Sequence, residues 1–253
     1  MTVIARHRPS VIATVAHELR GPLSALATAS ELLDRDFETL EAVQVRQMVS
    51  GLHRRTLVMR GLLENLLASA VIREGRLRVH LQPLDIVEII REVETIIRPL
   101  LVRRGQSVRV SPLATCPLVE ADAHRISQVL LNLLSNANKY ADAGTEIEIA
   151  VSMNRGAVRV SVSDRGPDLP RDALRGAFRA YDRAGRSGGE GLGIGLWVVR
   201  SIVRAHGGRV GAVNREGGGA TFWFELRPMA GRPIALPVDA TELGAEVGRV
   251  SAV

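Results

Sequence analysis

The sequence predicts an α+β protein, in which an N-terminal antiparallel helical hairpin precedes an α/β sandwich. Residues 3–72 place apolar side chains at alternating spacings of three and four, the heptad pattern of packed helices. From about residue 77 the pattern changes to short alternating strands separated by amphipathic helices, which is typical of a sheet covered by helices. We therefore expect a helical domain over 1–75, a second domain over 76–228 and a disordered tail over 229–253.

The hairpin is predicted from two apolar seams. The first seam consists of Ile12, Val15, Leu19, Pro22, Leu26, Ala29 and Leu33. The second seam spaces Val45, Leu52, Met59 and Leu66 seven residues apart and is widened by Met48, Val49, Leu62 and Leu63. The polar turn "DRDFET" lies between the seams and would fold the helices back on each other. Because two helices cannot bury seams of this length alone, we expect a homodimer that forms a four-helix bundle.

A lone histidine, His17, lies on the first predicted helix with Glu18 directly after it. If Ile12 and Leu19 occupy a positions of the heptad, His17 occupies an f position and faces solvent. Pro22 lacks the N–H that would bond the carbonyl of Glu18, so it predicts either a functional kink or a harmless bend. Burial in the bundle therefore does not explain His17.

Beyond residue 76 the predicted elements follow one another without long gaps. The predicted helices are "IVEIIREVETIIRPLL", "AHRISQVLLNLLSNANKYA" and "LGIGLWVVRSIVRAHGG". The predicted strands are the start of "RLRVHLQPLD", then "SVRVS", "PLVEAD", "TEIEIAVSM", "AVRVSVSD", "GRVGAVN" and "GATFWFELR". Together they predict helices clustered over one mixed sheet.

The composition argues against several classes of protein. No stretch reaches the about 18 apolar residues of a membrane span, and the N-terminus lacks the apolar core of a signal peptide, so we expect a cytoplasmic protein. The single cysteine, Cys116, excludes an internal disulfide. The net charge is +6, but the basic residues form no block and only 3% of residues are aromatic. A solvated surface is therefore favoured over a nucleic-acid interface.

The helix "AHRISQVLLNLLSNANKYA" carries polar residues that a plain core helix does not need. Spacings of four and three place Asn132, Asn136 and either Lys139 or Tyr140 on one face. Amide oxygens are hard ligands that suit Mg²⁺, and a lysine one turn further on can reach a phosphate. Ordinary surface residues are the alternative.

Two further stretches suggest a nucleotide. Asp164 ends an apolar strand ahead of Gly166, and a carboxylate there can accept a hydrogen bond from an exocyclic amine such as that of adenine. A plain turn at "DRGPD" is the alternative. The glycines of "GRSGGEGLGIGLWVV" lead straight into a helix, so backbone N–H groups can approach phosphates closely. Neither a preceding strand nor a following Gly-Lys-Ser/Thr is present, so Rossmann and P-loop sites fit poorly, while a flexible linker remains open.

Taken in order, these stretches resemble the sensor histidine kinases of two-component signalling. "AHELRGPLSAL" resembles the H-box of that family, "QVLLNLLSNANKY" its N-box and "DRGPDLP" its G1 box. "AFRAYDRA" resembles the F-box, "GEGLGIGLWVVRSIVRAHGG" the G2 box and "GGGATFWFEL" the final strand. The resemblance covers residues 8–227. It implies a dimerisation and phosphotransfer hairpin followed by an ATP-binding domain of the gyrase and histidine kinase type.

The resemblance also implies residue roles. His17 would be the phosphoacceptor, and Glu18 would orient or deprotonate its imidazole. ATP and Mg²⁺ would be the cofactors, with Asn136 as the metal ligand and Asn132 in support. The other nucleotide-binding residues would be Lys139, Tyr140, Asp164, Gly166, Gly191, Leu192, Gly193 and Thr221, beneath a lid over 171–190. The phosphoryl group would pass to an aspartate of a response regulator receiver domain, and sensory input would come from a separate protein or a region outside this chain.

Two residues depart from the family pattern. Gly21 stands four after His17, where many relatives carry the Thr or Asn that helps to hydrolyse phospho-aspartate, so we expect weak or absent phosphatase activity. Asp168 stands where the G1 box usually has its second glycine and could reduce the affinity for ATP. Asp168 favours the main alternative, a catalytically weak nucleotide-binding dimeric scaffold. An ATPase or serine kinase of the same nucleotide fold and a basic nucleic-acid binder are further alternatives.

Overall fold

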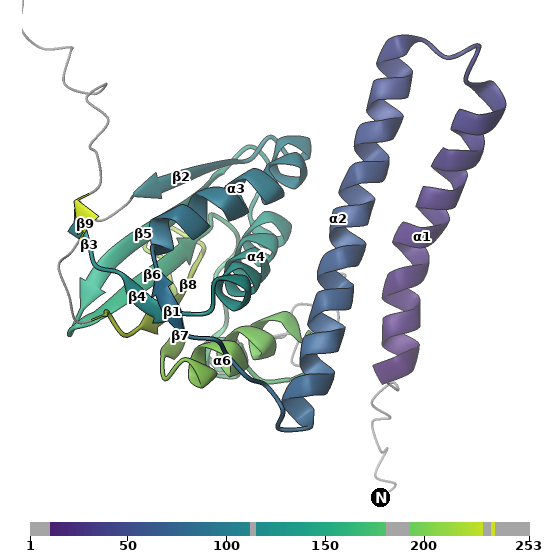
Figure 1. Ribbon diagram of the computed structural model, residues 1–253. Coiled ribbons are helices and arrows are strands. Elements are labelled where there is room, and N and C mark those ends of the chain that lie inside the picture. The colour runs from purple at the N-terminus through teal and green to yellow at the C-terminus, as the bar shows by residue number, and fades with distance from the viewer. Residues whose placement is uncertain (1–10, 112–114, 181–192, 230–233, 236–253) are drawn as a thin grey trace, which may run out of the picture.

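The computed structural model describes residues 11–111, 115–180, 193–229 and 234–235. A long helical hairpin stands beside a sheet that helices cover on the side facing the hairpin (Figure 1). The α+β class predicted from the sequence is confirmed. Within the described ranges, no helix is both long and apolar enough to cross a membrane.

The hairpin consists of α1 (Val11–Asp36) and α2 (Ala42–Arg73). α1 runs as one continuous helix through Pro22, and a capping box between Glu41 and Gln44 begins α2. The predicted seams are half-buried at Leu19, Pro22, Leu26, Ala29, Leu33, Val45, Met48, Leu52, Met59, Leu62 and Leu66. Val49 and Leu63 are 53% and 48% exposed in the single chain.

The main sheet has the strand order β2-β5-β6-β8-β7. Its strands are β2 (Ser107–Ser111), β5 (Glu146–Asn154), β6 (Ala157–Ser163), β8 (Ala220–Leu226) and β7 (Arg209–Asn214). β2 runs parallel to β5, and all other neighbours are antiparallel. The sheet is therefore mixed, as predicted, and β7 forms one of its edges.

Two small ladders flank this sheet. β1 (Gln82–Leu84) pairs with β4 (Val119–Ala121), and β3 (Thr115–Cys116) pairs with β9 (Ile234–Ala235). β9 falls within the stretch that the sequence predicts as a disordered tail, most of which lies outside the described residues. The two-residue strands are too short for any periodicity to predict.

Three helices cover the inner face of the sheet: α3 (Ile86–Arg103), α4 (Ala123–Tyr140) and α6 (Gly195–Ala205) (Figure 1). Asp85 caps α3 by accepting a hydrogen bond from the N–H of Val87, and Asp122 caps α4 in the same way through Arg125. α6 begins three residues later than predicted, because Gly193 has a φ of +66°, which a right-handed helix excludes. A short helix, α5 (Arg171–Gly176), lies beyond β6 and was not predicted.

The core between the sheet and these helices is aliphatic. Val158, Val160 and Val162 of β6 are buried, while the intervening Arg159 and Ser161 lie on the opposite face. The largest fully buried side chains include Leu130, Leu133 and Leu134 of α4, Ile202 of α6, and Phe224 of β8. Burying each such side chain contributes about 1.5–3 kcal/mol, so this layer fixes where the ends of α4, β6 and α6 meet.

Candidate nucleotide site and phosphoacceptor helix

Polar residues from four predicted motifs meet where α4, β6, β8 and α6 come together. Asp164 directly follows β6, and its neighbour Ser163 pairs in register with Thr221 of β8. A Cβ placed on Gly166 would lie 2.3 Å from the carbonyl oxygen of Tyr140, which ends α4. A Cβ on Gly195 at the start of α6 would lie 3.1 Å from Oδ1 of Asn132. Residues far apart in the sequence therefore line one region.

Asp164 is held rigidly at the centre of this region. The residue is 3% exposed, and its Oδ1 accepts hydrogen bonds from the N–H groups of Gly166 (2.9 Å) and Ala220 (3.4 Å). Such bonds offset the cost of burying a carboxylate and fix its direction. Beside it the hydroxyls of Ser163 and Thr221 lie 2.9 Å apart. The arrangement presents a fixed buried acceptor, which is the chemistry that reading an adenine amine requires.

Asp168 supports the loop that passes beside Asp164. Gly219 has a φ of +101°, and a Cβ there would lie 2.1 Å from the carbonyl oxygen of Asp164, so only glycine fits. The N–H of Gly219 donates to Oδ1 of Asp168 at 3.2 Å. The departure from the family pattern at position 168 thus supplies a hydrogen bond to the glycine loop.

The two asparagines of α4 have different surroundings. Asn136 is half-buried, and within the described ranges its side-chain amide forms no hydrogen bond. Its oxygen is a hard donor of the kind that Mg²⁺ accepts alongside phosphate oxygens, so the residue fits a shared protein–nucleotide metal site. Asn132 is 9% exposed and forms two reciprocal hydrogen bonds with Asn65 of α2, at 2.7 and 2.9 Å. Asn132, a predicted site residue, is therefore hydrogen-bonded to the helical hairpin.

Asn65 and its surroundings were missed by sequence reasoning. Besides the amide pair, Nε2 of Gln128 donates to the carbonyl oxygen of Glu64 at 3.3 Å, so α4 is tied to α2 at two successive turns. An asparagine within an apolar helical run is a weak signal, because asparagine has a poor helix propensity. Nothing local in the sequence links Asn65 to a residue 67 positions away.

The last turn of α4, which carries Lys139 and Tyr140, is fixed by two residues that follow α3. The guanidinium of Arg104 donates to the carbonyl oxygens of Asn138, Lys139 (2.7 Å) and Ala141 (3.0 Å). The Gln106 amide also donates to Ala141. A cation at a helix C-terminus satisfies orphan carbonyls and opposes the helix dipole. Nζ of Lys139 lies 5.0 Å from the ring centroid of Tyr140.

The glycine-rich loop is described only at its end. Gly193 precedes α6, whose first N–H groups lack intrahelical partners and are suited to an anion. Gly191 and Leu192 lie outside the described residues, as does 181–190 of the predicted lid, while α5 occupies its first part.

The phosphoacceptor candidate lies on α1. The backbone of His17 is helical, but its side chain lies outside what the structure describes. Glu18 follows it with a half-buried side chain, and Gly21 is exposed.

Comparison with known proteins matches both parts of the chain. Residues 9–75 match the family model of the His Kinase A (phospho-acceptor) domain, and residues 121–229 match that of the histidine kinase-, DNA gyrase B- and HSP90-like ATPase. The chain is 30% identical over 226 residues, 87% of its length, to the sensor protein KdpD of Clostridium acetobutylicum. It spans only 25% of KdpD, and 59% of the 32% identical adaptive-response sensory kinase SasA of Thermosynechococcus vestitus.

Solved structures agree with these matches. Full-length ShkA in complex with AMPPNP has a TM-score of 0.61 and 30% identity, over 87% of this chain and 46% of that one. The catalytic domain of ThkA has a TM-score of 0.54 and 30% identity, over 59% of this chain and 96% of that one. ThkA in complex with the response regulator protein TrrA has a TM-score of 0.56 and 25% identity, over 86% of this chain and 61% of that one. With a phospho-acceptor hairpin followed by an ATP-binding domain, the chain belongs to the sensor histidine kinases of two-component systems.

Proposed function

We propose that this chain is an ATP-dependent histidine autokinase, which phosphorylates His17 and passes the phosphoryl group to an aspartate of a response regulator. The observation that carries the proposal is the meeting of Asp164, Thr221 and Tyr140 in one region of a domain that is joined to a phosphoacceptor hairpin. The complex of ThkA with TrrA supports a receiver domain as the partner.

Different residues of the candidate site would bind the base, the phosphates and the metal ion, as phosphoryl transfer requires. Positioning and charge neutralisation count for more than covalent help in this chemistry. Asp164 would bind the base, backed by Thr221, while Lys139 and the N–H groups after Gly193 would hold phosphate oxygens. Bound Mg²⁺ would neutralise phosphate charge, and the amide oxygen of Asn136 would hold it.

The acceptor side needs a neutral, correctly oriented imidazole. An imidazole is largely neutral near pH 7 and then carries a nucleophilic nitrogen. Glu18, the adjacent carboxylate on α1, would fix the tautomer of His17 and take up its proton. Both residues belong to helix α1, so the bound nucleotide would have to approach this helix for transfer.

A homodimer would complete the hairpin. Large apolar side chains exposed on α1, α2 and the turn between them are Leu23, Leu32, Phe37, Val43, Val49, Val58, Leu63 and Leu67. So many exposed apolar side chains on two helices are typical of a surface that a second copy covers. Sedimentation velocity should report twice the mass of the chain, and a monomer at micromolar concentration would contradict this pairing.

The decisive experiment labels the protein with γ-labelled ATP and Mg²⁺. We expect acid-labile label on the native chain and none on His17→Gln, whereas His53→Gln, an exposed histidine of α2, should label normally. A catalytically weak scaffold, the alternative that Asp168 favours, would bind ATP without acquiring label. Acid-stable label would instead indicate a serine kinase. Either result would overturn the proposal.

Gly21 bears on a second activity, the hydrolysis of phospho-aspartate on the partner. It has no side chain to assist that reaction, so native phosphatase activity should be weak. A Cβ at Gly21 would meet nothing within 4 Å, so Gly21→Thr fits without strain and should raise dephosphorylation of the phosphorylated partner. Gly61→Thr on α2, where a Cβ also meets nothing, is the matched control. No gain on Gly21→Thr would count against this explanation.

A further inference from the structure

A hollow of about 700 Å³ lies around the edge strand β7. Among the described residues, none that was assigned individually to His17 chemistry or to ATP lines it, while Arg175 and Phe178 belong to the first part of the predicted lid. Six arginines line it: Arg155, Arg159, Arg175, Arg200, Arg204 and Arg209. Of the described residues, Glu225 is the single carboxylate that lines it. The histidine kinase activity proposed above leaves this concentration of positive charge unexplained.

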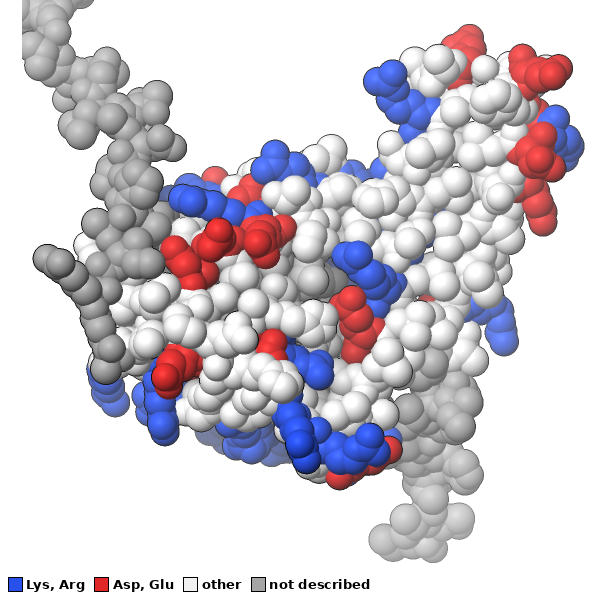
Figure 2. All heavy atoms as spheres, viewed as in Figure 1, with Lys and Arg blue, Asp and Glu red and all other residues white. Residues whose placement is uncertain are grey.

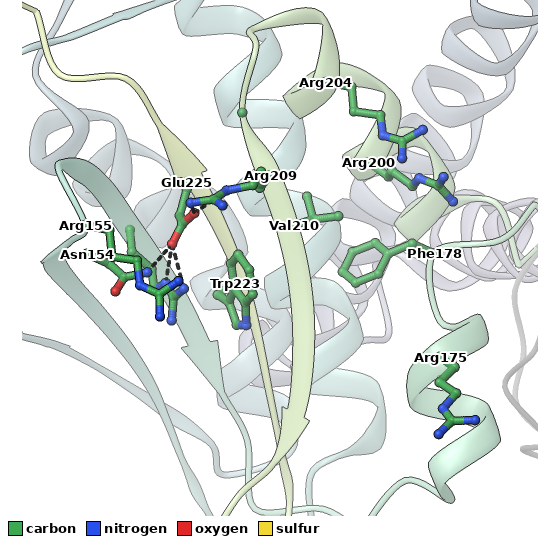
Figure 3. A pocket seen from close by; sticks show the side chains of 12 residues that line it. Asn154, Arg155, Arg175, Phe178, Arg200, Arg204, Arg209, Val210, Trp223 and Glu225 are labelled. Atoms are coloured by element: carbon green, nitrogen blue, oxygen red, sulfur yellow. Dashed lines mark hydrogen bonds and ion pairs between the residues drawn. The ribbon is translucent and has the colours of Figure 1, made fainter.

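The hollow passes around the free edge of the sheet. Arg209 and Val210 are consecutive on β7 and both line it, yet neighbouring strand residues point to opposite faces. In Figure 3, Arg209 reaches towards Glu225 on one side of β7, while Val210 and Phe178 lie on the other. β7 is the last strand of the sheet, and its outer edge forms no backbone hydrogen bond with any residue in the described ranges. Unpaired backbone groups are thus offered beside the hollow.

The single carboxylate does not balance the arginines. Glu225 is 2% exposed and is paired with Arg159 at 2.6 Å and Arg209 at 3.0 Å. Arg159 is further fixed by stacking 4.0 Å from the ring centroid of Trp223. This side of β7 is therefore already ordered and keeps a net positive charge.

The remaining arginines have no carboxylate partner. Among the described residues, Arg155, Arg175, Arg200 and Arg204 form no ion pair. Arg200 and Arg204 lie one turn apart on α6, with both guanidinium groups on the side of Val210 (Figure 3). Figure 2 shows Lys and Arg side chains gathered along the lower margin of the sandwich, in the region of α6 and β7 in Figure 1. A concave surface with uncompensated cations concentrates anionic groups.

We propose that this hollow binds an acidic, extended segment of a partner protein, which adds as a further strand to the free edge of β7. An added strand satisfies the backbone groups of the edge and projects alternate side chains to both faces of the sheet. Arginines line the hollow on both faces of the sheet at β7, so carboxylates at successive positions of the segment would each lie near a cation. A small free anion would use the arginines but leave the strand edge unpaired, which is why the geometry favours a peptide.

The test uses the full chain and a fluorescent peptide with Glu at successive central positions between Val residues, matched in length to β7. We expect saturable binding by fluorescence anisotropy that weakens with salt, and no binding of the same peptide with Gln in place of Glu. Arg200→Gln with Arg204→Gln should weaken binding by about tenfold or more, since each charged hydrogen bond lost weakens affinity severalfold. Arg91→Gln with Arg98→Gln, on α3, removes the same charge elsewhere and should leave binding unchanged. Equal effects of the two pairs would overturn the site.

A second peptide tests strand addition itself. N-methylation of its backbone amides keeps the carboxylates but prevents pairing with a strand edge. We expect this peptide to bind at least about tenfold more weakly, because several edge hydrogen bonds are lost. If it binds equally well, or if inorganic tripolyphosphate binds the hollow as tightly as the peptide, the site takes free anions and the strand proposal is wrong. Arg175→Gln, at an exposed position of α5, repeats the charge test if the α6 variants unfold.

Discussion

Replacing Glu225 by Gln tests how the outer face of the sheet is stabilised. The carboxylate of Glu225 accepts hydrogen bonds from Asn154, Arg159 and Arg209 while only 2% exposed. Burial alone would raise the pKa of Glu225, but the hydrogen bonds from Asn154 and Arg159 and the charges of Arg159 and Arg209 outweigh it. The pKa of Glu225 therefore lies below its ordinary value.

The size of the effect follows from the exposure of the partners. Breaking a buried ion pair costs about 3–5 kcal/mol, because an uncompensated charge stays buried. Here the arginine side chains of Arg159 and Arg209 are 29% and 65% exposed, so water can rehydrate them and reduce the loss. We expect Glu225→Gln to lower the free energy of unfolding by about 2–3 kcal/mol at pH 7. Urea unfolding should show a lower midpoint with an unchanged slope.

The pH dependence gives an independent readout. Because the folded-state pKa of Glu225 is lowered, its contribution is complete above the unfolded pKa and is lost as pH falls through the folded value. The difference between the native chain and Glu225→Gln should thus be constant from pH 8 to about 5 and shrink below about 4. Glu216→Gln, at an exposed position without an ion pair among the described residues, is the control. A loss below about 0.5 kcal/mol, or one that persists unchanged in acid, would refute the reasoning.

Three further predictions concern other contacts. A double-mutant cycle of Asn65→Ala and Asn132→Ala, measured by urea unfolding, should give a coupling of about 1–3 kcal/mol, and additive losses would contradict the amide pair. Gly211→Val should destabilise the chain by about 1–3 kcal/mol in thermal unfolding, because a Cβ there lies 2.2 Å from the Trp223 ring; a native melting temperature would contradict this. Burial raises the pKa of the Cys116 thiol to about 11, so a thiol reagent at pH 8 should label it only on unfolding, and rapid native labelling would refute this.

Long periodic elements were predictable from the sequence. β5, β6 and β8 alternate between buried and outward residues over most of their length, and α4 buries one face, so each pattern is local. β3, β9 and α5 are too short for any period, and only tertiary pairing defines them. The delayed start of α6 depends on the positive φ of Gly193, which glycine permits but does not require.

The residues of the candidate site were predicted, but the residues that hold α4 in position beside them were not. The meeting of Asp164, Gly166 and Thr221 with the end of α4 was predictable, because the resemblance supplied the order of the motifs. Arg104 was not predicted, since its role depends on carbonyls of a helix more than thirty residues away. Asn65 was missed for the same reason, since a hydrogen bond between side chains far apart in the chain leaves no periodic signature.

The amide pair between α2 and α4 engages Asn132, a residue that is also predicted to support the nucleotide site. Asn65 and a ligand would therefore compete for its carboxamide. Asn132 offers a single carboxamide, and both its oxygen and its NH₂ group are occupied by Asn65. A ligand that takes over these two positions of the carboxamide must displace Asn65, at a cost of about 1–3 kcal/mol for two hydrogen bonds. The two equilibria are linked. If breaking the contact between α2 and α4 strengthens ligand binding at Asn132 by some factor, ligand binding at Asn132 weakens that contact by the same factor.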